Sequence, residues 1–219
     1  TKKFDEFSLP NLTNSFSFSE NSNSNSKFSL ISSRILNNSL FSKIINFLFI
    51  VYIEFMTIIV KDKHTLLYKD FKFKCCVGKN NFSKRKIEGD KKTPIGLFEI
   101  GNLFYRADRL KRPITELKTC RINKYMGWCN KANHKKYNKL IRITKKKCHE
   151  ILFRNDYKYD LLIPIKYNYK KVVPNKGSAI FIHLTKKYKP TTGCIGLSKK
   201  DFLILIKVIN KNTKIKILS

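Results

Sequence analysis

The sequence predicts a mainly β fold with one or two short helices. Three observations lead to this prediction. From residue 57 onward, short runs rich in branched and aromatic residues alternate with charged, Gly or Asn turns, which is the pattern of strands and hairpins. A single clear helical period lies near the C-terminus. Hydrophobic residues make up 42% of the 219 positions, enough for the core of one ordinary domain with a tail, or of two small domains.

The N-terminal segment, residues 1–43, differs in composition from the rest of the chain. Ser and Asn occupy more than half of the positions from Ser8 to Ser42, and no clear apolar period is present. Such a segment buries little apolar surface, so it cannot offset the entropy cost of folding. We therefore expect residues 1–43 to be a low-complexity region that is disordered or does not belong to the native chain.

Residues 44–60, IINFLFIVYIEFMTIIV, form the most apolar run of the chain and are the candidate membrane anchor. The run is slightly short for a span of about 20 residues, and Glu54 would be costly inside a bilayer. Arg34 and Lys43 precede it, as basic residues precede an uncleaved N-terminal anchor. In the expected domain organisation this apolar segment is residues 44–56.

Met56 offers a second interpretation of the N-terminal region. The chain begins with Thr1, and Met56 lies where the composition changes. Under this interpretation Met56 is the true start, residues 1–55 are upstream sequence, and no export signal is visible. N-terminal sequencing of the native protein distinguishes the two interpretations, because a native chain that begins before Met56 contradicts this start.

The folded region, residues 57–217, contains short apolar runs that we expect to form strands. One of them, GSAIFIHL, has no polar residue between Ala179 and Ile182, which predicts a strand buried on both faces. We expect residues 102–160 to be irregular. The predicted strands are TIIV (57–60), HTLLY (64–68), KFKCCVG (72–78), IGLFEIG (95–101), DLLIPIKY (160–167) and GSAIFIHL (177–184).

One helix is predicted over residues 198–210, SKKDFLILIKVIN. Ser198 is a suitable N-cap, and Asp201 three positions later completes a capping-box arrangement with Asp in place of Glu. After the helix, TKIKIL alternates Lys with Ile and predicts a half-buried last strand. The apolar face of the helix consists of Phe202, Leu205, Ile206 and Ile209.

The formal net charge of +31 raises the question of a polyanionic partner such as nucleic acid, anionic lipid or an acidic wall polymer. A simpler explanation is biased codon usage, since Lys, Asn, Ile and Phe are abundant together. The lysines are scattered through every segment, and the sequence has no zinc-finger spacing, basic region with heptads, or RNA-recognition pattern. Scattered lysines are typical of a solvated surface, so nucleic-acid binding is disfavoured and kept as an alternative.

The six cysteines could form a disulfide framework or be buried as free thiols. No C-x-x-C pair is present, which argues against a structural zinc site. If Cys194 is a free nucleophile, five cysteines remain and at least one more stays unpaired, so buried free thiols are the expected state. The cysteines are Cys75, Cys76, Cys120, Cys129, Cys148 and Cys194.

The stretch IFIHLTKKYKPTTGCIGL, residues 180–197, places His183 at the end of an apolar run and Cys194 directly after Gly193. A thiolate is a strong nucleophile, and a nearby imidazole can accept the thiol proton. The backbone N–H groups of Thr192, Gly193 and Cys194 could converge as an oxyanion hole. On spacing alone, a structural histidine and a packed cysteine remain the alternative.

The stretch HLTKKYKPTTGCIGL resembles the signature of the L,D-transpeptidase catalytic-domain family, in which a His and a loop are followed by Ser/Thr-His-Gly-Cys. Upstream, GDKKTPIGLFEIG (89–101) is similar to the family's Thr-Pro-x-Gly-x-Phe segment. The resemblance covers about residues 57–217. Thr192 stands where the family usually has His, and Gly196 where Asn or Arg is common. Further stretches that resemble a bacterial branch of the family are FYRADR (104–109), MGWCNKANHKKYN (126–138), CHEILFRNDYKYDLL (148–162) and NKGSAIFIHL (175–184).

The resemblance implies an L,D-transpeptidase-like β-sandwich or barrel and a two-step acyl transfer. Cys194 would attack a diamino-acid carbonyl in a peptidoglycan tetrapeptide stem, D-Ala would leave, and an amine of a neighbouring stem would accept the acyl group. His183 would donate and accept the protons, oriented by the backbone carbonyl of Leu184. The resemblance implies no metal, no cofactor, a monomer, and a location in the bacterial cell envelope or periplasm if the chain is exported.

Three further side chains are weaker candidates for substrate binding. Arg106 could hold a substrate carboxylate with its planar guanidinium, and the alternative is a local ion pair with Asp108. Trp128 could form a wall of the groove, or it could be a core residue. His149, together with Glu150, could line the site, and the alternative is a surface ion pair.

Other functions fit the same residues. A cysteine L,D-carboxypeptidase or amidase shares the acyl-enzyme step but uses water in place of the amine, so product analysis separates it from a transpeptidase. A non-catalytic basic protein that binds the wall or nucleic acid predicts that Cys194→Ala changes nothing. A sortase is disfavoured because the Thr-Leu-x-Thr-Cys element is absent from the sequence.

Overall fold

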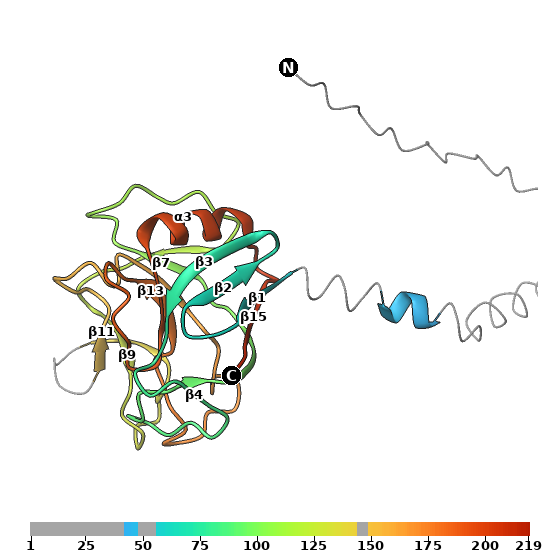
Figure 1. Cartoon of the computed structure of the whole chain (residues 1–219). Coiled ribbons are helices and arrows are strands. Elements are labelled where there is room, and N and C mark those ends of the chain that lie inside the picture. Colours follow the sequence, from blue (N-terminus) through green and yellow to red (C-terminus); the bar gives the residue numbers. More distant parts are fainter. Residues whose placement is uncertain (1–41, 48–55, 144–148) are drawn as a thin grey trace, which may run out of the picture. The chain divides into compact units, whose positions relative to one another are not determined.

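The computed structural model describes residues 42–47, 56–143 and 149–219. Contacts within the chain divide it into two units, residues 1–49 and residues 50–219, and each unit is described by itself. In the first unit, residues 42–47 form a short helix with exposed side chains (Figure 1). The remaining part of the predicted low-complexity region lies outside the described residues.

The candidate membrane anchor is described only at its two ends. No helix within the described ranges is long and apolar enough to cross a membrane. Residues 48–55, the middle of the apolar run, lie outside those ranges. An anchor that continues to residue 60 is wrong, because Thr57–Val60 form strand β1 and pair with two neighbours in the main sheet.

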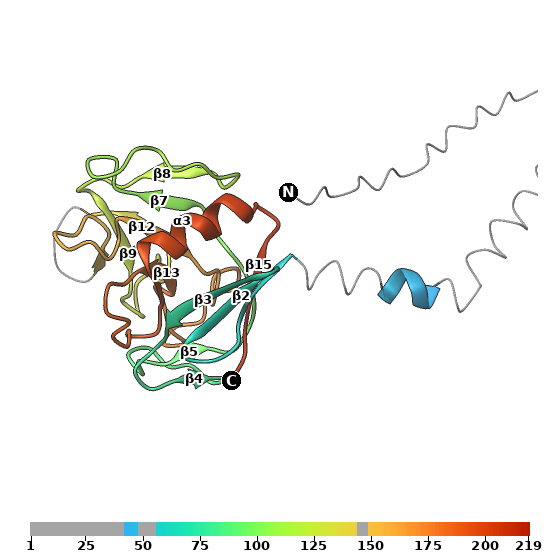
Figure 2. The same ribbon diagram turned by 45° about the horizontal axis from the view of Figure 1, so that its top comes forward.

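The second unit is mainly β, which confirms the predicted fold class. Its main sheet is curled and contains ten strands in the order β6-β15-β1-β2-β3-β14-β13-β12-β7-β8 (Figures 1 and 2). Three neighbouring pairs are parallel: β1 with β15, β13 with β14, and β7 with β8. The bounds of these strands are β1 Thr57–Val60, β2 Thr65–Tyr68, β3 Phe71–Cys76, β6 Gly96–Glu99, β7 Leu103–Tyr105, β8 Thr119–Arg121, β12 Leu161–Pro164, β13 Phe181–Leu184, β14 Ile195–Leu197 and β15 Lys214–Ile217.

Two smaller sheets complete the described strands. One has the order β10-β9-β11, and the other pairs β4 with β5 in parallel. The expectation that residues 102–160 are irregular is wrong, because β7 to β11 lie there. These strands have only three or four residues each, too few for an alternating pattern to stand out in the sequence. The bounds are β4 Phe82–Ser83, β5 Thr93–Pro94, β9 Met126–Cys129, β10 Leu140–Arg142 and β11 His149–Ile151.

Strand β13 is buried on both faces, as the apolar run predicted. Ile182 and Leu184 belong to the larger hydrophobic core, which also contains the buried face of the C-terminal helix. Phe181 belongs to a second core that includes Cys194. Because side chains alternate along a strand, His183 shares a face with Phe181 and lies beside this second core. The strand therefore holds the histidine between two packed layers.

The helix α3, Lys199–Val208, confirms the predicted C-terminal helix, and it lies against the main sheet (Figure 2). The backbone N–H of Asp201 donates to Ser198 Oγ at 3.1 Å, which is the predicted N-cap contact. The last strand, β15, alternates exposed Lys with buried Ile, also as predicted. The four residues of the predicted apolar face are fully buried: Phe202, Leu205, Ile206 and Ile209.

Ser198→Ala tests the contribution of this cap to stability. The substitution leaves the Asp201 N–H without its acceptor, and loss of an N-cap hydroxyl costs about 1 kcal/mol. We expect the urea midpoint of unfolding to fall accordingly, with an unchanged m-value. Ser198→Asp is the control, because its carboxylate can also cap the helix, and it should retain most of the stability.

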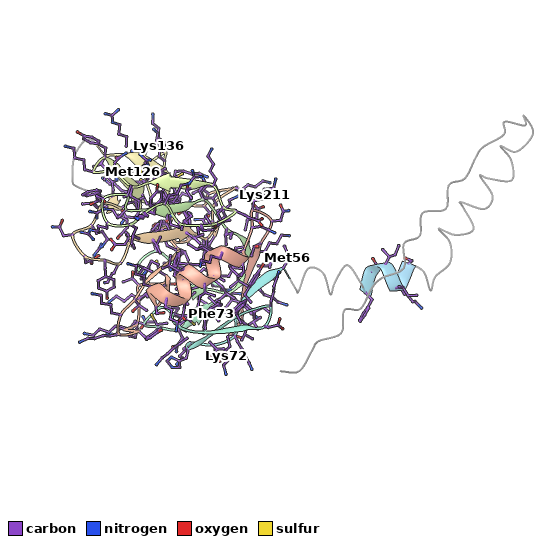
Figure 3. The ribbon with its side chains drawn as sticks, turned by 90° about the horizontal axis from the view of Figure 1, so that it is seen from above. Met56, Lys72, Phe73, Met126, Lys136 and Lys211 are labelled. Carbon is purple, nitrogen blue, oxygen red and sulfur yellow. The ribbon has the colours of Figure 1, made fainter. Side chains whose placement is uncertain are left out.

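The lysines project from widely separated places on the second unit. Lys72, Lys136 and Lys211 are exposed and point outward in Figure 3. Some lysines are paired locally, such as Lys166 and Lys170, which both contact Glu99. This arrangement agrees with the expectation of a solvated basic surface.

Candidate active site

His183 is positioned by its own strand and by the next residue. Its Nδ1 lies 2.9 Å from the carbonyl oxygen of Leu184, the contact that the family resemblance implied. A carbonyl can only accept a hydrogen bond, so Nδ1 carries the proton and Nε2 has a free lone pair. The side chain is buried, with 7% of its surface exposed. This contact leaves His183 ready to accept a proton at Nε2.

Cys194 lies at the end of the loop that follows β13, immediately before β14. The Phe181 N–H donates to its Sγ at 3.4 Å, and the thiol donates to the Ala179 carbonyl at 3.3 Å. The side chain retains 6% of its surface exposed. His183 pairs in register with Gly196, two residues beyond Cys194, because β13 and β14 are adjacent parallel strands. The sheet therefore brings both side chains to the same place.

Gly193 is required by both conformation and space. Its φ of +134° lies in a region that other residues rarely adopt. A Cβ at this position would lie 2.8 Å from the Lys92 carbonyl oxygen. The turn that presents Cys194 therefore depends on glycine, which explains why the thiol directly follows one.

Two threonines hold the loop that carries Cys194. Thr191 Oγ1 donates to the Cys194 carbonyl at 2.6 Å and accepts from the Gly193 N–H at 3.1 Å. Thr93 Oγ1 donates to the Gly193 carbonyl at 2.9 Å and accepts from the Gly78 N–H at 2.9 Å. Thr93 is fully buried. The Thr-Pro segment noted in the sequence therefore supports the cysteine loop, a role that the sequence analysis did not assign.

Thr93→Val tests this support. Valine has nearly the same shape but cannot satisfy the buried Gly78 N–H and Gly193 carbonyl, which costs about 1–3 kcal/mol. We expect a lower free energy of unfolding and slower modification of Cys194 by an acyl donor. Thr93→Ser keeps the hydroxyl and should retain the modification rate. Equal rates in the Val and Ser variants would show that the hydroxyl does not position the loop.

The backbone donors near Cys194 differ from the expected row of three. The Gly193 N–H already donates to Thr191 Oγ1, so it is engaged in this conformation. The N–H groups of Thr192 and Cys194 have no hydrogen-bond partner in the described part of the chain. Thr192 is exposed and lines the pocket in front of Cys194. Two of the three predicted donors are thus available there.

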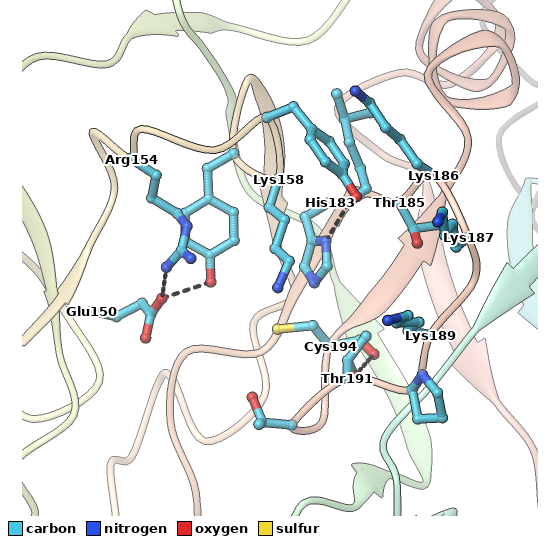
Figure 4. A pocket seen from close by; sticks show the side chains of 15 residues that line it. Glu150, Arg154, Lys158, His183, Thr185, Lys186, Lys187, Lys189, Thr191 and Cys194 are labelled. Atoms are coloured by element: carbon cyan, nitrogen blue, oxygen red, sulfur yellow. Dashed lines mark hydrogen bonds and ion pairs between the residues drawn. The ribbon is translucent and has the colours of Figure 1, made fainter.

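His183 and Cys194 line one pocket of about 520 Å³ (Figure 4). Its walls come from β11, from the loop before β12, from the end of β13, and from the loop that leads to Cys194. The size suits a short peptide segment more than a single small ion. The lining residues are Glu150, Arg154, Tyr157, Lys158, Tyr159, His183, Leu184, Thr185, Lys186, Lys187, Lys189, Pro190, Thr191, Thr192 and Cys194.

A second set of contacts surrounds His183. The Tyr159 ring lies edge-on to the imidazole, with 5.6 Å between ring centroids, and its hydroxyl donates to Glu150 Oε1 at 2.9 Å. Arg154 Nη1 donates to the same carboxylate oxygen at 3.3 Å. Burial raises the pKa of Tyr159, so the phenol stays protonated and acts as a donor. Tyr159 and Arg154 were not among the predicted site residues, although both lie in the stretch CHEILFRNDYKYDLL that resembles the family.

The protonation states of the pair follow from burial. Burial lowers the pKa of His183 to about 4, and the positive charges of Lys158 and Arg154 act in the same direction. Burial raises the pKa of the Cys194 thiol to about 12. At neutral pH the unliganded site therefore holds a neutral thiol and a neutral imidazole. The thiol must lose its proton as substrate is attacked.

The three weaker candidates lie outside this pocket. Arg106 is buried and forms two hydrogen bonds with the carboxylate of Asp108, at 2.7 and 2.6 Å. Trp128 is in the second core, and its Nε1–H donates to Asn138 Oδ1 at 2.9 Å. His149 lies on β11 with its Nδ1 buried and without a partner in the described part of the chain. None of them is among the lining residues.

Within the described ranges, no group of three or more His, Cys, Asp or Glu residues is arranged to hold a metal ion. The five cysteines in those ranges are free thiols, and Cys148 lies outside them.

The fold and the site define a mainly β protein with a histidine and a cysteine in one pocket. A family model of the L,D-transpeptidase catalytic domain, YkuD, matches residues 49–217. The chain belongs to this family, as the sequence resemblance indicated. No curated protein matches the chain.

Two solved structures are similar to part of the chain. One is the helical cell shape determining protein Pgp2 from Campylobacter jejuni, at 17% identity and a TM-score of 0.37. The other is the K307A mutant of the same protein, at 17% identity and a TM-score of 0.36. Each alignment covers 74% of this chain, and 46% and 45% of the respective matched chain. This chain therefore spans less than half the length of the protein it matches.

Proposed function

We propose that the protein is a peptidoglycan L,D-transpeptidase in which Cys194 is the nucleophile and His183 transfers the protons. The observation that supports this most strongly is the contact between His183 Nδ1 and the Leu184 carbonyl. It leaves Nε2 as a base in the same pocket as the Cys194 thiol. Membership of the L,D-transpeptidase family provides the reaction class.

In the first step the Cys194 thiol leaves its hydrogen bond with the Ala179 carbonyl and transfers its proton to His183 Nε2. Sulfur attacks the diamino-acid carbonyl of a stem tetrapeptide, and the carbonyl oxygen becomes negatively charged. The N–H groups of Thr192 and Cys194 are the available donors to that oxygen. The C–N bond to D-Ala then breaks, His183 protonates the leaving amine, and a thioester remains on Cys194.

In the second step an amine from a neighbouring stem attacks the thioester carbonyl. His183 accepts the proton of the amine and returns it to the sulfur as the C–S bond breaks. The products are a new amide cross-link and the free thiol. The reaction places the protein at the cell envelope, where it would contribute to wall biogenesis.

The products of a reaction with a synthetic stem tetrapeptide test this proposal. We expect the full chain to release D-Ala and, with a stem amine present, to form a cross-linked dimer. Release of D-Ala with only a trimmed tripeptide as product would assign the site to an L,D-carboxypeptidase. Absence of D-Ala release from a folded chain with donor in excess would contradict both enzymes and favour a non-catalytic wall-binding protein.

A further inference from the structure

The pocket in front of His183 and Cys194 has an unequal distribution of charge. One of its lining side chains is acidic, Glu150, and five are basic. We refer to four of the basic residues as the basic lip. The basic lip consists of Lys158, Lys186, Lys187 and Lys189, and the fifth basic residue is Arg154.

The single carboxylate of the pocket already has hydrogen-bond partners within the protein. Glu150 accepts hydrogen bonds from Arg154 and from the Tyr159 hydroxyl. Arg154 also forms two hydrogen bonds with Asp156, at 2.9 and 2.7 Å. None of the four basic-lip lysines forms an ion pair in the described part of the chain. Their positive charge is therefore available to a ligand.

Backbone contacts hold the basic-lip lysines beside the pocket. Lys158 is held next to β13, because its carbonyl accepts a hydrogen bond from the Leu184 N–H at 3.0 Å. Between Lys187 and Lys189, Tyr188 has a φ of 49° and its ring packs under the Lys74 ammonium at 4.8 Å. Tyr188 is thus turned toward β3, while both of its lysine neighbours line the pocket.

The basic-lip lysines, His183 and Cys194 line the same pocket. In Figure 4 the ends of Lys158 and Lys189 point into the space in front of His183 and Cys194. Lys186 differs from them, since its ammonium lies over the Tyr157 ring at 4.5 Å. Several like charges around a small pocket repel one another, and an anionic ligand relieves this repulsion. An anion bound here would lie next to the reacting thiol.

We propose that the basic lip selects acyl donors by their free carboxylates. This inference rests on the proposed function and specifies its substrate. The preferred donor is a stem peptide whose diamino acid carries a free side-chain carboxylate, and the disfavoured donor carries a carboxamide at that position. A peptide is favoured over a long polyanion because Lys158 and Lys189 point into a pocket of peptide size that also holds the thiol.

The size of the expected preference for a carboxylate over a carboxamide follows from the charge of its contact with lysine. A hydrogen bond that involves a charged group contributes more than a neutral one, and a single such contact changes affinity about tenfold or more. A carboxamide keeps the size of the group but removes the charge. Lys158 and Lys189 should make the largest contribution, because Lys186 is engaged with Tyr157.

Binding to full-length Cys194→Ala tests the inference without turnover. The probes are two tetrapeptides that are identical except for a carboxylate or a carboxamide on the diamino-acid side chain, measured by calorimetry at physiological salt. We expect the carboxylate peptide to bind about tenfold or more tightly than its amide. Adding Lys158→Gln and Lys189→Gln should reduce this preference to about twofold or less.

Lys211→Gln with Lys216→Gln is the matched control, because it removes the same charge at exposed positions outside the pocket. This control should keep the preference. Equal binding of the two peptides, or an equal loss in the control, would overturn the inference, since the preference would then be absent or due to net charge.

Acylation of the unmutated chain by the same two peptides separates this inference from the proposed function. A carboxylate preference in binding, without an acyl adduct from either peptide, would contradict the proposed function and leave the basic lip as a binding site. Equal acylation rates with both peptides would support the proposed function and overturn the selectivity.

Discussion

Replacement of Cys194 by Ala abolishes release of D-Ala from a stem tetrapeptide, because no other group in the pocket can form the thioester. The remaining pocket side chains are hydroxyl, carboxylate, imidazole, ammonium, guanidinium and apolar groups. None of these replaces a thiol that is activated by a neighbouring imidazole. The measurement is D-Ala release over time, with an expected rate equal to that of the uncatalysed control.

Cys120→Ala is the matched control for this prediction. Cys120 is a half-buried free thiol that does not line the pocket. Its replacement should leave D-Ala release unchanged. If Cys194→Ala keeps its activity while Cys120→Ala loses it, the nucleophile has been assigned to the wrong cysteine.

Replacement of His183 by Ala removes the group that accepts the thiol proton. General acid and base catalysis contributes about 10² to 10⁴-fold, so the acylation rate should fall by that factor. The thiol has a pKa of about 12, so very little thiolate forms at neutral pH without a base. The acylation rate of the variant should rise as pH increases toward 12. Mass spectrometry of rapidly quenched samples would record this rate.

The same pKa values predict the pH dependence of the unmutated protein. The pKa of His183 is lowered to about 4, so the imidazole is neutral and competent above that pH and protonated below it. We expect kcat/KM to stay nearly level from neutral pH down to about 5 and to fall as pH decreases through about 4. A profile that falls already between pH 7 and pH 6 would show a preformed thiolate and imidazolium in place of a neutral pair.

Much of the frame around the site could be predicted from the sequence. The run GSAIFIHL predicted a strand buried on both faces, and β13 places its side chains in two cores. The helix after Ser198 was predictable because its cap and its apolar period are local features. His183 and Cys194 could be proposed as a catalytic pair because they lie in one short stretch, with a glycine, that resembles the family signature.

Other parts of the site depend on contacts between distant residues and gave weaker signals. Thr93 supports the cysteine loop across 100 residues of sequence, and only its place in the Thr-Pro segment pointed to it. Tyr159 reaches His183 through a ring contact that no spacing predicts. The strands between residues 102 and 160 are short and defined by their partners. The basic lip could not be recognised from the sequence, because lysine is abundant throughout the chain.

Mass spectrometry of the acylated chain, with the modified residue located by sequencing, tests whether Cys194 carries the acyl group. The full chain is mixed with a stem tetrapeptide, quenched in acid within seconds, and then digested and sequenced by tandem mass spectrometry. We expect an added mass equal to that of the tetrapeptide minus that of free D-Ala, attached at Cys194. An unmodified Cys194 in a folded chain that nevertheless releases D-Ala would show that the release proceeds without a thioester on Cys194.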